Sequence, residues 1–182
     1  MKFNLLTYSL IISLLLGSTT SESKFKMKYT FSFRTFYNTF FITSDNGAVI
    51  ITNWAIDQKE GYNDRLLQSK NLLAVRTESY GLIKGEINVL ESENKKASFY
   101  KYDHIVEAGI KVESGSLQIL ECPSSAINLD IKVKPGIYRV RVYFSNMVGY
   151  DSDEDKEDDY YKIEVWPDSN MERKVLKRYS KL

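Results

Sequence analysis

Three runs of alternating apolar and polar residues near the end of the chain constrain its fold most strongly. They occupy residues 129–134, 137–144 and 160–166. Alternation with a period of two is typical of a strand that buries one face, so each run predicts a half-buried β-strand. Pro135 and Gly136 separate the first two runs and suit a type II turn, because proline presets the first φ and glycine accepts the positive second φ. We therefore expect a three-stranded antiparallel meander.

Similar runs precede the meander, and turn-forming residues separate them. The runs occupy residues 28–33, 36–42, 48–52, 71–77, 81–91, 102–112 and 116–121. One short helix is expected at 54–60, with Asn53 as its N-cap. Roughly nine strands at such short spacing, with almost no helical periodicity, predict an all-β fold, an antiparallel β-sandwich. We expect this domain to span residues 28–168 and a basic C-terminal tail to follow at 169–182.

The first 22 residues have the composition of a secretory signal peptide. Lys2 precedes an apolar run at 5–16, and small residues follow at 17–20. Signal peptides share this order, and the run is shorter than a membrane-spanning helix needs. We therefore expect residues 1–22 to be a signal peptide. The mature protein would then be secreted or held in the periplasm or envelope, with no integral membrane span; the alternative is a start at Met27 and a cytoplasmic protein.

An acidic segment separates the last two predicted strands, and its seven acids and one lysine carry a net charge of −6. Its acids are Asp151, Asp153, Glu154, Asp155, Glu157, Asp158 and Asp159. Acidic surfaces attract basic proteins and speed their association, so we expect this segment to contact a basic protein partner such as a nuclease or toxin. A solvated loop is the alternative. The whole chain carries a net charge of +1, so no nucleic-acid partner is expected.

The acidic segment resembles a calcium-binding loop only superficially. An EF-hand loop needs glycine at its sixth position and a bidentate glutamate at its twelfth. Lys156 and Lys162 occupy these positions, which excludes an EF-hand and leaves weak calcium binding of another kind open. We predict no metal site and no cofactor.

A second candidate surface lies on the polar face of the predicted hairpin. Its residues are Arg139, Arg141 and Tyr143 on one strand and Trp166 on the next. Arginine and large aromatic residues are enriched where protein interfaces bind most strongly, so we expect these side chains to contact the partner. The alternative is that the arginines pair with Glu164 across the strands, a contact that adds only tenths of a kcal/mol, roughly, to stability.

The sequence offers little for catalysis. His104 is the single histidine, and its position in an alternating run places it on the apolar face of a strand. Cys122 is the single cysteine, with no predicted base beside it. The phosphate-binding, dinucleotide-binding, metalloprotease and serine-hydrolase motifs are all missing from the sequence. We therefore predict that the protein is not an enzyme and that His104 is structural.

Several segments carry a resemblance to known proteins. They include the aromatic run at 36–42, P-G-I-Y-R at 135–139 and W-P at 166–167. With these segments, residues 29–167 resemble a broad group of uncharacterised bacterial β-sandwich proteins. They are more distantly similar to the competence protein J family, which inhibits a DNA-entry nuclease. No binding motif of that family can be matched residue by residue, so the resemblance assigns no site.

The resemblance implies a non-enzymatic protein that binds and blocks a nuclease or a similar toxin. The apparent export signal and the basic tail depart from a cytoplasmic inhibitor, although an exported nuclease would meet an exported inhibitor. The alternative function is a secreted or envelope β-sandwich with a structural role or a small-ligand role, in which exposed tyrosines and Trp166 stack on sugar rings.

Overall fold

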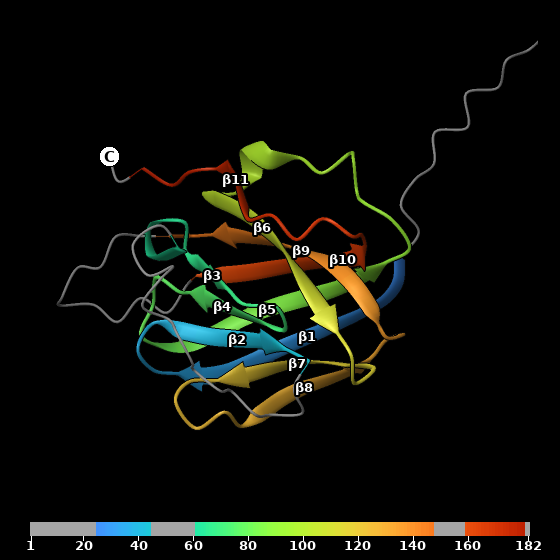
Figure 1. Cartoon of the computed structure of the whole chain (residues 1–182). Helices are drawn as coiled ribbons and strands as arrows, with labels where there is room; N and C mark the ends of the chain where they lie inside the picture. The colour runs from blue at the N-terminus through green and yellow to red at the C-terminus, as the bar shows by residue number, and fades with distance from the viewer. Residues whose placement is uncertain (1–24, 45–60, 148–158, 181–182) are drawn as a thin grey trace, which may run out of the picture.

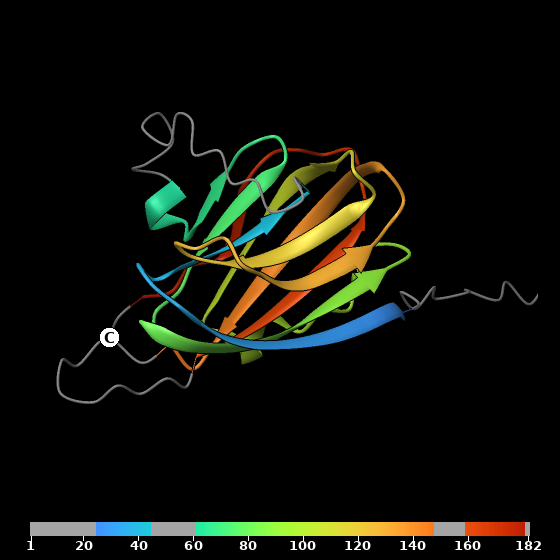
Figure 2. The same ribbon diagram turned by 90° about the horizontal axis from the view of Figure 1, so that it is seen from below.

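The computed structural model describes residues 25–44, 61–147 and 159–180, and these form two packed β-sheets (Figures 1 and 2). The six-stranded sheet has the order β1 (Phe25–Thr35), β5 (Gly81–Leu90), β10 (Tyr160–Pro167), β9 (Gly136–Ser145), β6 (His104–Val112) and β11 (Lys174–Lys177). The five-stranded sheet has the order β3 (Leu66–Gln68), β4 (Leu72–Arg76), β2 (Thr39–Thr43), β7 (Ser116–Glu121) and β8 (Ile127–Lys132). The predicted all-β sandwich is confirmed.

The sheets pair antiparallel except for one contact, since β10 runs parallel to β5. Helical structure in the described residues is confined to a turn at 61–63 and the 3-10 helix η1 (Phe99–Lys101). That part of the chain contains no helix long and apolar enough to cross a membrane. The predicted helix at 54–60 and strand at 48–52 lie outside the described residues, as do the proposed signal peptide and all but one acid of the acidic segment.

The alternating residues fill the space between the sheets as predicted. Phe31 and Phe33 of β1 pack on Phe40 of β2, with ring centroids 5.9 and 6.2 Å apart. Tyr161 of β10 lies against Phe40 and against Phe144 of β9, at 5.5 and 5.2 Å. Edge-to-face contacts of this kind add about 1 kcal/mol to what burial alone contributes. The aromatic runs at both ends of the sequence therefore form one core.

The predicted meander is wrong in its first connection. Strand β8 pairs with β7 in the five-stranded sheet, whereas β9 belongs to the other sheet, so the chain crosses between layers at 133–135. Gly136 is the first residue of β9 and has no positive φ, which excludes the predicted type II turn. Alternation shows that a strand is half buried but does not show which strand it pairs with. The β9–β10 hairpin is confirmed.

The basic C-terminal segment is part of the six-stranded sheet rather than a separate tail. Its strand β11 pairs with the edge of β6. Just before it, the Met171 carbonyl accepts a 2.5 Å hydrogen bond from the side chain of Gln68 in β3, which also donates to the Gly109 carbonyl. Neither β3 nor β11 was predicted, because three or four residues are too few to show a periodic pattern.

Gly85 provides a test of the packing between β1, β5 and β10. It pairs with Phe31 on one side and Tyr161 on the other, and a Cβ built there would overlap the Tyr161 carbonyl oxygen and the Phe31 ring. We expect Gly85→Ala to lower the free energy of unfolding in urea by about 2 kcal/mol or more, as overpacking does. At Gly136 a Cβ meets nothing closer than 3.7 Å, so Gly136→Ala should be near neutral. Equal effects of the two substitutions would contradict the packing described.

Candidate functional site

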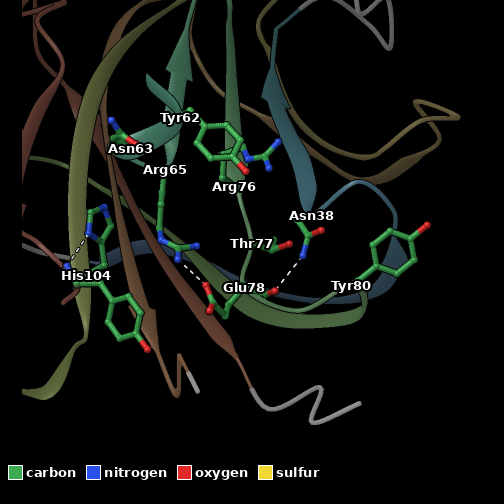
Figure 3. Close-up of a pocket in the computed structure, with 10 residues that line it drawn as sticks. Asn38, Tyr62, Asn63, Arg65, Arg76, Thr77, Glu78, Tyr80 and His104 are labelled. Carbon is green, nitrogen blue, oxygen red and sulfur yellow. Dashed lines mark hydrogen bonds and ion pairs between the residues drawn. The ribbon is translucent and has the colours of Figure 1, made fainter. Parts of the chain in front are cut away.

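A pocket of about 580 Å³ opens at one end of the sandwich (Figure 3). Strands β1 and β4 end here, and β2, β3, β5 and β6 begin here. Its walls come from Asn38 in the β1–β2 connection, from the segments at 62–65 and 76–80, and from His104 and Tyr179. The pocket is therefore built from loops that a rigid scaffold holds together, which is where binding residues of β-sandwiches commonly lie.

The connection between β1 and β2 has a constrained backbone. Tyr37 and Asn38 have φ values of 55° and 49°, a left-handed conformation that is uncommon for tyrosine. The side chain of Asn38 donates a 2.9 Å hydrogen bond to the Glu78 carbonyl, and the Thr77 N–H donates a 2.9 Å bond to the Asn38 carbonyl. These bonds tie the connection to the β4–β5 loop and hold Tyr37 outward, where 64% of it is exposed.

Two arginines line the pocket and differ in their partners. Arg65 forms an ion pair with Glu78 at 2.5 Å. The guanidinium of Arg76 lies 4.3 Å from the centroid of the Tyr62 ring, and its Nη1 is 3.4 Å from Thr39 Oγ1. Among the described residues no carboxylate pairs with Arg76. The pocket thus contains one positive charge that the described residues do not compensate with a carboxylate.

Exposed aromatic rings surround this charge. Seven large hydrophobic side chains of the described residues are exposed, and four of them belong to this end: Phe36, Tyr37, Tyr62 and Tyr80. The Phe36 and Tyr80 rings pack edge to face with centroids 5.7 Å apart. Large exposed rings that gather beside an arginine are typical of a surface that another molecule covers.

His104 lies at the inner wall of the pocket and is buried. Its Nε2 is 2.9 Å from the Asp64 carbonyl, and its Nδ1 accepts a 3.2 Å hydrogen bond from the Tyr179 N–H. A neutral ring with its proton on Nε2 satisfies both bonds. Burial lowers the pKa of His104 from 6.5 to about 4 despite the bond to Asp64, and the charges of Arg65 and Arg178 lower it further. The predicted position of this histidine on the buried face of its strand is confirmed.

Cys122 also has a structural setting. Its backbone N–H donates to the Thr35 hydroxyl, and its side chain packs beside a small apolar cluster on the outer side of the five-stranded sheet. Burial raises the pKa of the Cys122 thiol, although Arg76 opposes this. A thiol with a raised pKa holds little of the reactive thiolate. No group of three or more potential metal ligands occurs within the described residues.

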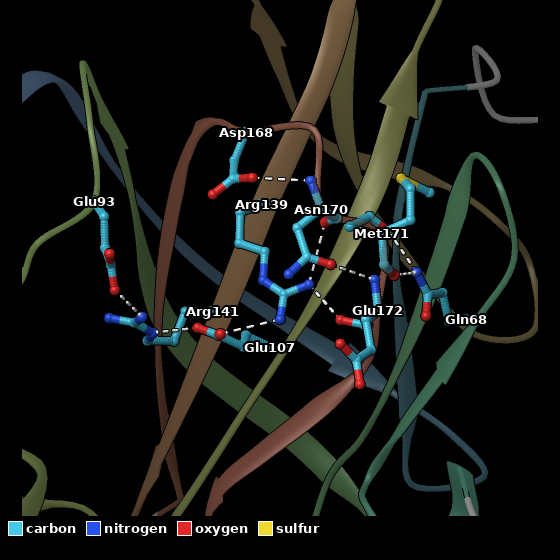
Figure 4. Close-up of polar contacts among 10 residues, drawn as sticks. Gln68, Glu93, Glu107, Arg139, Arg141, Asp168, Asn170, Met171 and Glu172 are labelled. Carbon is cyan, nitrogen blue, oxygen red and sulfur yellow. Dashed lines mark hydrogen bonds and ion pairs between the residues drawn. The ribbon is translucent and has the colours of Figure 1, made fainter.

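The prediction that Arg139 and Arg141 lie on an exposed patch is wrong, since each is only 3% exposed. Both point to Glu107 of β6, which accepts 3.0 Å and 2.7 Å hydrogen bonds from them (Figure 4). Arg139 also donates to the carbonyls of Asn170 and Glu172 in the C-terminal segment. The partner of the arginines is therefore Glu107 on the neighbouring strand, not the predicted Glu164.

Tyr143 and Trp166 are buried as well, which corrects the rest of that patch. The Tyr143 hydroxyl donates a 2.6 Å hydrogen bond to Glu164, and Trp166 lies 4.9 Å from the Arg141 guanidinium. The segment that follows β5 covers them: its Glu93 pairs with Arg141 at 2.7 Å, and its Phe99 packs on Tyr143. Polar alternation identified the outer face of the sheet but not the segments that cover it.

Asp159 is the one predicted acid that the structure describes. It is buried, and it accepts hydrogen bonds from the Ser79 N–H, at 3.1 Å, and from the Tyr161 hydroxyl. These bonds fasten the start of β10 to the β4–β5 loop. The prediction that Asp159 contacts a partner directly is therefore wrong, because in the folded chain its side chain is buried. The other six acids lie outside the described residues: Asp151, Asp153, Glu154, Asp155, Glu157 and Asp158.

Sequence reasoning missed the pocket itself. Asn38 was placed inside a predicted strand at 36–42, and the other lining residues in loops or near strand ends. The available signal was the presence of Tyr62 and Tyr80 in polar connections, because loops seldom need large rings for packing. What the sequence could not show is that these loops meet at one end of the sandwich.

Together, these observations define a two-layer β-sandwich with a pocket built largely from loops at one end. No protein-family model matches the chain, and no curated protein sequence matches it. Its structure is similar to that of ComJ from Bacillus subtilis, described as an inhibitor of the DNA-degrading activity of NucA. The TM-score is 0.59 with 13% sequence identity over 81% of this chain and all of ComJ.

A second solved structure, the product of crocagin biosynthetic gene J, is also similar. It has a TM-score of 0.50 and 18% identity over 78% of this chain and 99% of its own. At these identities the likeness shows a shared fold. A distant ComJ-like fold agrees with the resemblance noted in the sequence.

The Glu107 network predicts unequal effects of two similar substitutions. Glu107→Gln removes the carboxylate that Arg139 and Arg141 share, and Arg139 then has no carboxylate among the described residues, while Arg141 keeps Glu93. Breaking a buried ion pair costs about 3–5 kcal/mol. Glu93 is more exposed, with 39% of its side chain accessible, so Glu93→Gln should cost less than about 1 kcal/mol. Urea unfolding measures both. A Glu107→Gln variant as stable as Glu93→Gln would contradict the network.

The lowered pKa of His104 predicts that the free energy of unfolding depends on pH. Because the unfolded chain takes up a proton near pH 6.5 and the folded chain only near 4, the stabilising contribution of His104 is complete above pH 6.5 and is lost as the pH falls to 4. The loss amounts to about 3 kcal/mol. In a His104→Gln variant the free energy of unfolding should fall less over this range. Parallel pH profiles of the two proteins would show that His104 does not titrate in this way.

Proposed function

We propose that the chain is a non-enzymatic binding module that attaches to a protein and blocks its activity, and that this partner is a DNA-degrading nuclease. The likeness to ComJ supports the proposal, because it extends over the whole of that inhibitor. The engagement of His104 by two backbone groups also favours binding over catalysis, since both ring nitrogens are already used.

The observation that carries the proposal is the surface at the pocket end. Four exposed aromatic residues lie there on loops that are hydrogen-bonded to one another. At the end of β4 lies Arg76, with which no carboxylate of the described residues pairs. A surface that is rigid before binding loses little conformational entropy when a partner docks. In contrast, Trp166 is buried, which removes the tryptophan expected to stack on sugars in the alternative, small-ligand function.

The acidic segment has a second role in this proposal. Its six acids at 151–158 would attract a basic nuclease at long range, before the aromatic surface makes contact. We further propose that the chain is exported and meets an exported nuclease. Long-range attraction changes the association rate and its salt dependence more than the final affinity.

The proposal is tested by adding the purified chain to the exported and cytosolic fractions of its native host and following the degradation of plasmid DNA. We expect at least a tenfold loss of nuclease activity in one fraction, together with retention of a nuclease on the immobilised chain. Undiminished DNA degradation at a hundredfold molar excess, with no protein retained, would overturn the proposal.

Charge variants test the role of the acidic segment. Replacing the six acids at 151–158 by Asn or Gln should slow association with the retained nuclease about tenfold at low salt and flatten its salt dependence. A control variant changes Glu91, Glu113 and Glu172, which are exposed acids elsewhere, to Gln. Equal association rates for the two variants would show that the acidic segment does not guide the partner.

A further inference from the structure

We infer that the pocket receives an acidic side chain of the protein partner and that Arg76 is the residue that binds it. The inference rests on the proposed function, because it takes the occupant to be a protein. It names the contact that would hold the two proteins together at this end of the sandwich.

The charge of the pocket favours a carboxylate. Arg65 is neutralised by Glu78 at 2.5 Å, and His104 is buried with both nitrogens bonded. This leaves Arg76, whose side chain makes one hydrogen bond within the described part of the chain, the 3.4 Å contact with Thr39. A guanidinium has five N–H donors in a planar fork that matches the two oxygens of a carboxylate.

The geometry of Arg76 prepares it for this contact. Its guanidinium lies over the Tyr62 ring at 4.3 Å, so one face is covered by the ring (Figure 3). Stacking holds the group in place and leaves the N–H groups at its edge for a ligand. The pairing is also stronger beside a ring than in open water, because the ring excludes solvent from one side.

The residues around Arg76 indicate a protein rather than a nucleic acid. Tyr62 lies on the arginine and Tyr80 lines the same pocket, with Phe36 packed on Tyr80. All three rings are exposed, and such rings form the centres of protein interfaces. A nucleic-acid site needs several cations along the phosphate backbone. Here the lining residues contribute one uncompensated charge, and the whole chain has a net charge of +1. A partner that is basic overall still presents aspartates and glutamates locally. The acidic segment can therefore attract the same partner whose acidic side chain binds Arg76.

The first test uses a phage-displayed library of random peptides, selected on the wild-type chain. Enriched peptides should contain an aspartate or glutamate beside an apolar residue. Their binding should weaken at least tenfold on Arg76→Gln and stay unchanged on Arg34→Gln, an exposed arginine of β1 that does not line the pocket. Thermal unfolding of both variants verifies the fold. Enriched peptides without acids, an empty selection, or equal binding to Arg76→Gln would overturn the inference.

Two further probes separate this occupant from others. A labelled single-stranded DNA oligonucleotide and a panel of oligosaccharides should show no binding that depends on Arg76. Saturable binding of either probe that is lost in Arg76→Gln would replace the protein side chain with that ligand class and overturn the inference.

The nuclease retained by the wild-type chain tells the two proposals apart. If the wild-type chain and Arg76→Gln retain and inhibit the nuclease equally, the pocket inference is overturned and the inhibitor function is supported. If no nuclease is inhibited or retained while acidic peptides still bind through Arg76, the inhibitor function fails and the pocket remains a carboxylate-binding site.

Discussion

The buried carboxylate of Glu107 is the interaction on which the outer layer of this sandwich depends. It is the carboxylate that Arg139 and Arg141 share, and among the described residues it is the only carboxylate paired with Arg139. Because Arg139 also donates to two carbonyls of the C-terminal segment, that segment can lie across the sheet and extend it with β11. Replacing such a network by apolar residues often stabilises a protein, whereas breaking it is costly. In this chain the network sets where two covering segments dock.

The covering segments also determine where recognition is possible. Every residue of β9 from Tyr138 to Phe144 is buried, although two of the seven are arginines. The outer face of the central sheet is therefore occupied by the chain itself. Exposed rings and the arginine without a carboxylate partner gather instead at the pocket end, around Arg76 and Tyr62. The proposed binding surface is thus on the loops, and the sheets position it.

Features that depend on neighbouring residues could be predicted from the sequence, whereas features that depend on contacts between distant residues could not. The alternation in 137–144 and 160–166 identified β9, β10 and their hairpin correctly, because a period of two is a local property. It could not show that β8 belongs to the other sheet, since pairing depends on residues far apart in the chain. Arg139 and Trp166 were read as surface residues because polar alternation marks a face and not its cover. The pocket was missed because its loops meet only in the folded chain.

Hydrogen exchange of the chain, measured by mass spectrometry with and without the nuclease it retains, tests the central claim most directly. The account predicts that the partner slows exchange in the connections at 36–39, 61–65 and 77–80. It also predicts no change in β8, whose outer residues are exposed on the far edge of the five-stranded sheet. Protection confined to β8 or to the C-terminal segment, with the three connections exchanging as before, would contradict the claim that this protein recognises its partner at the pocket end.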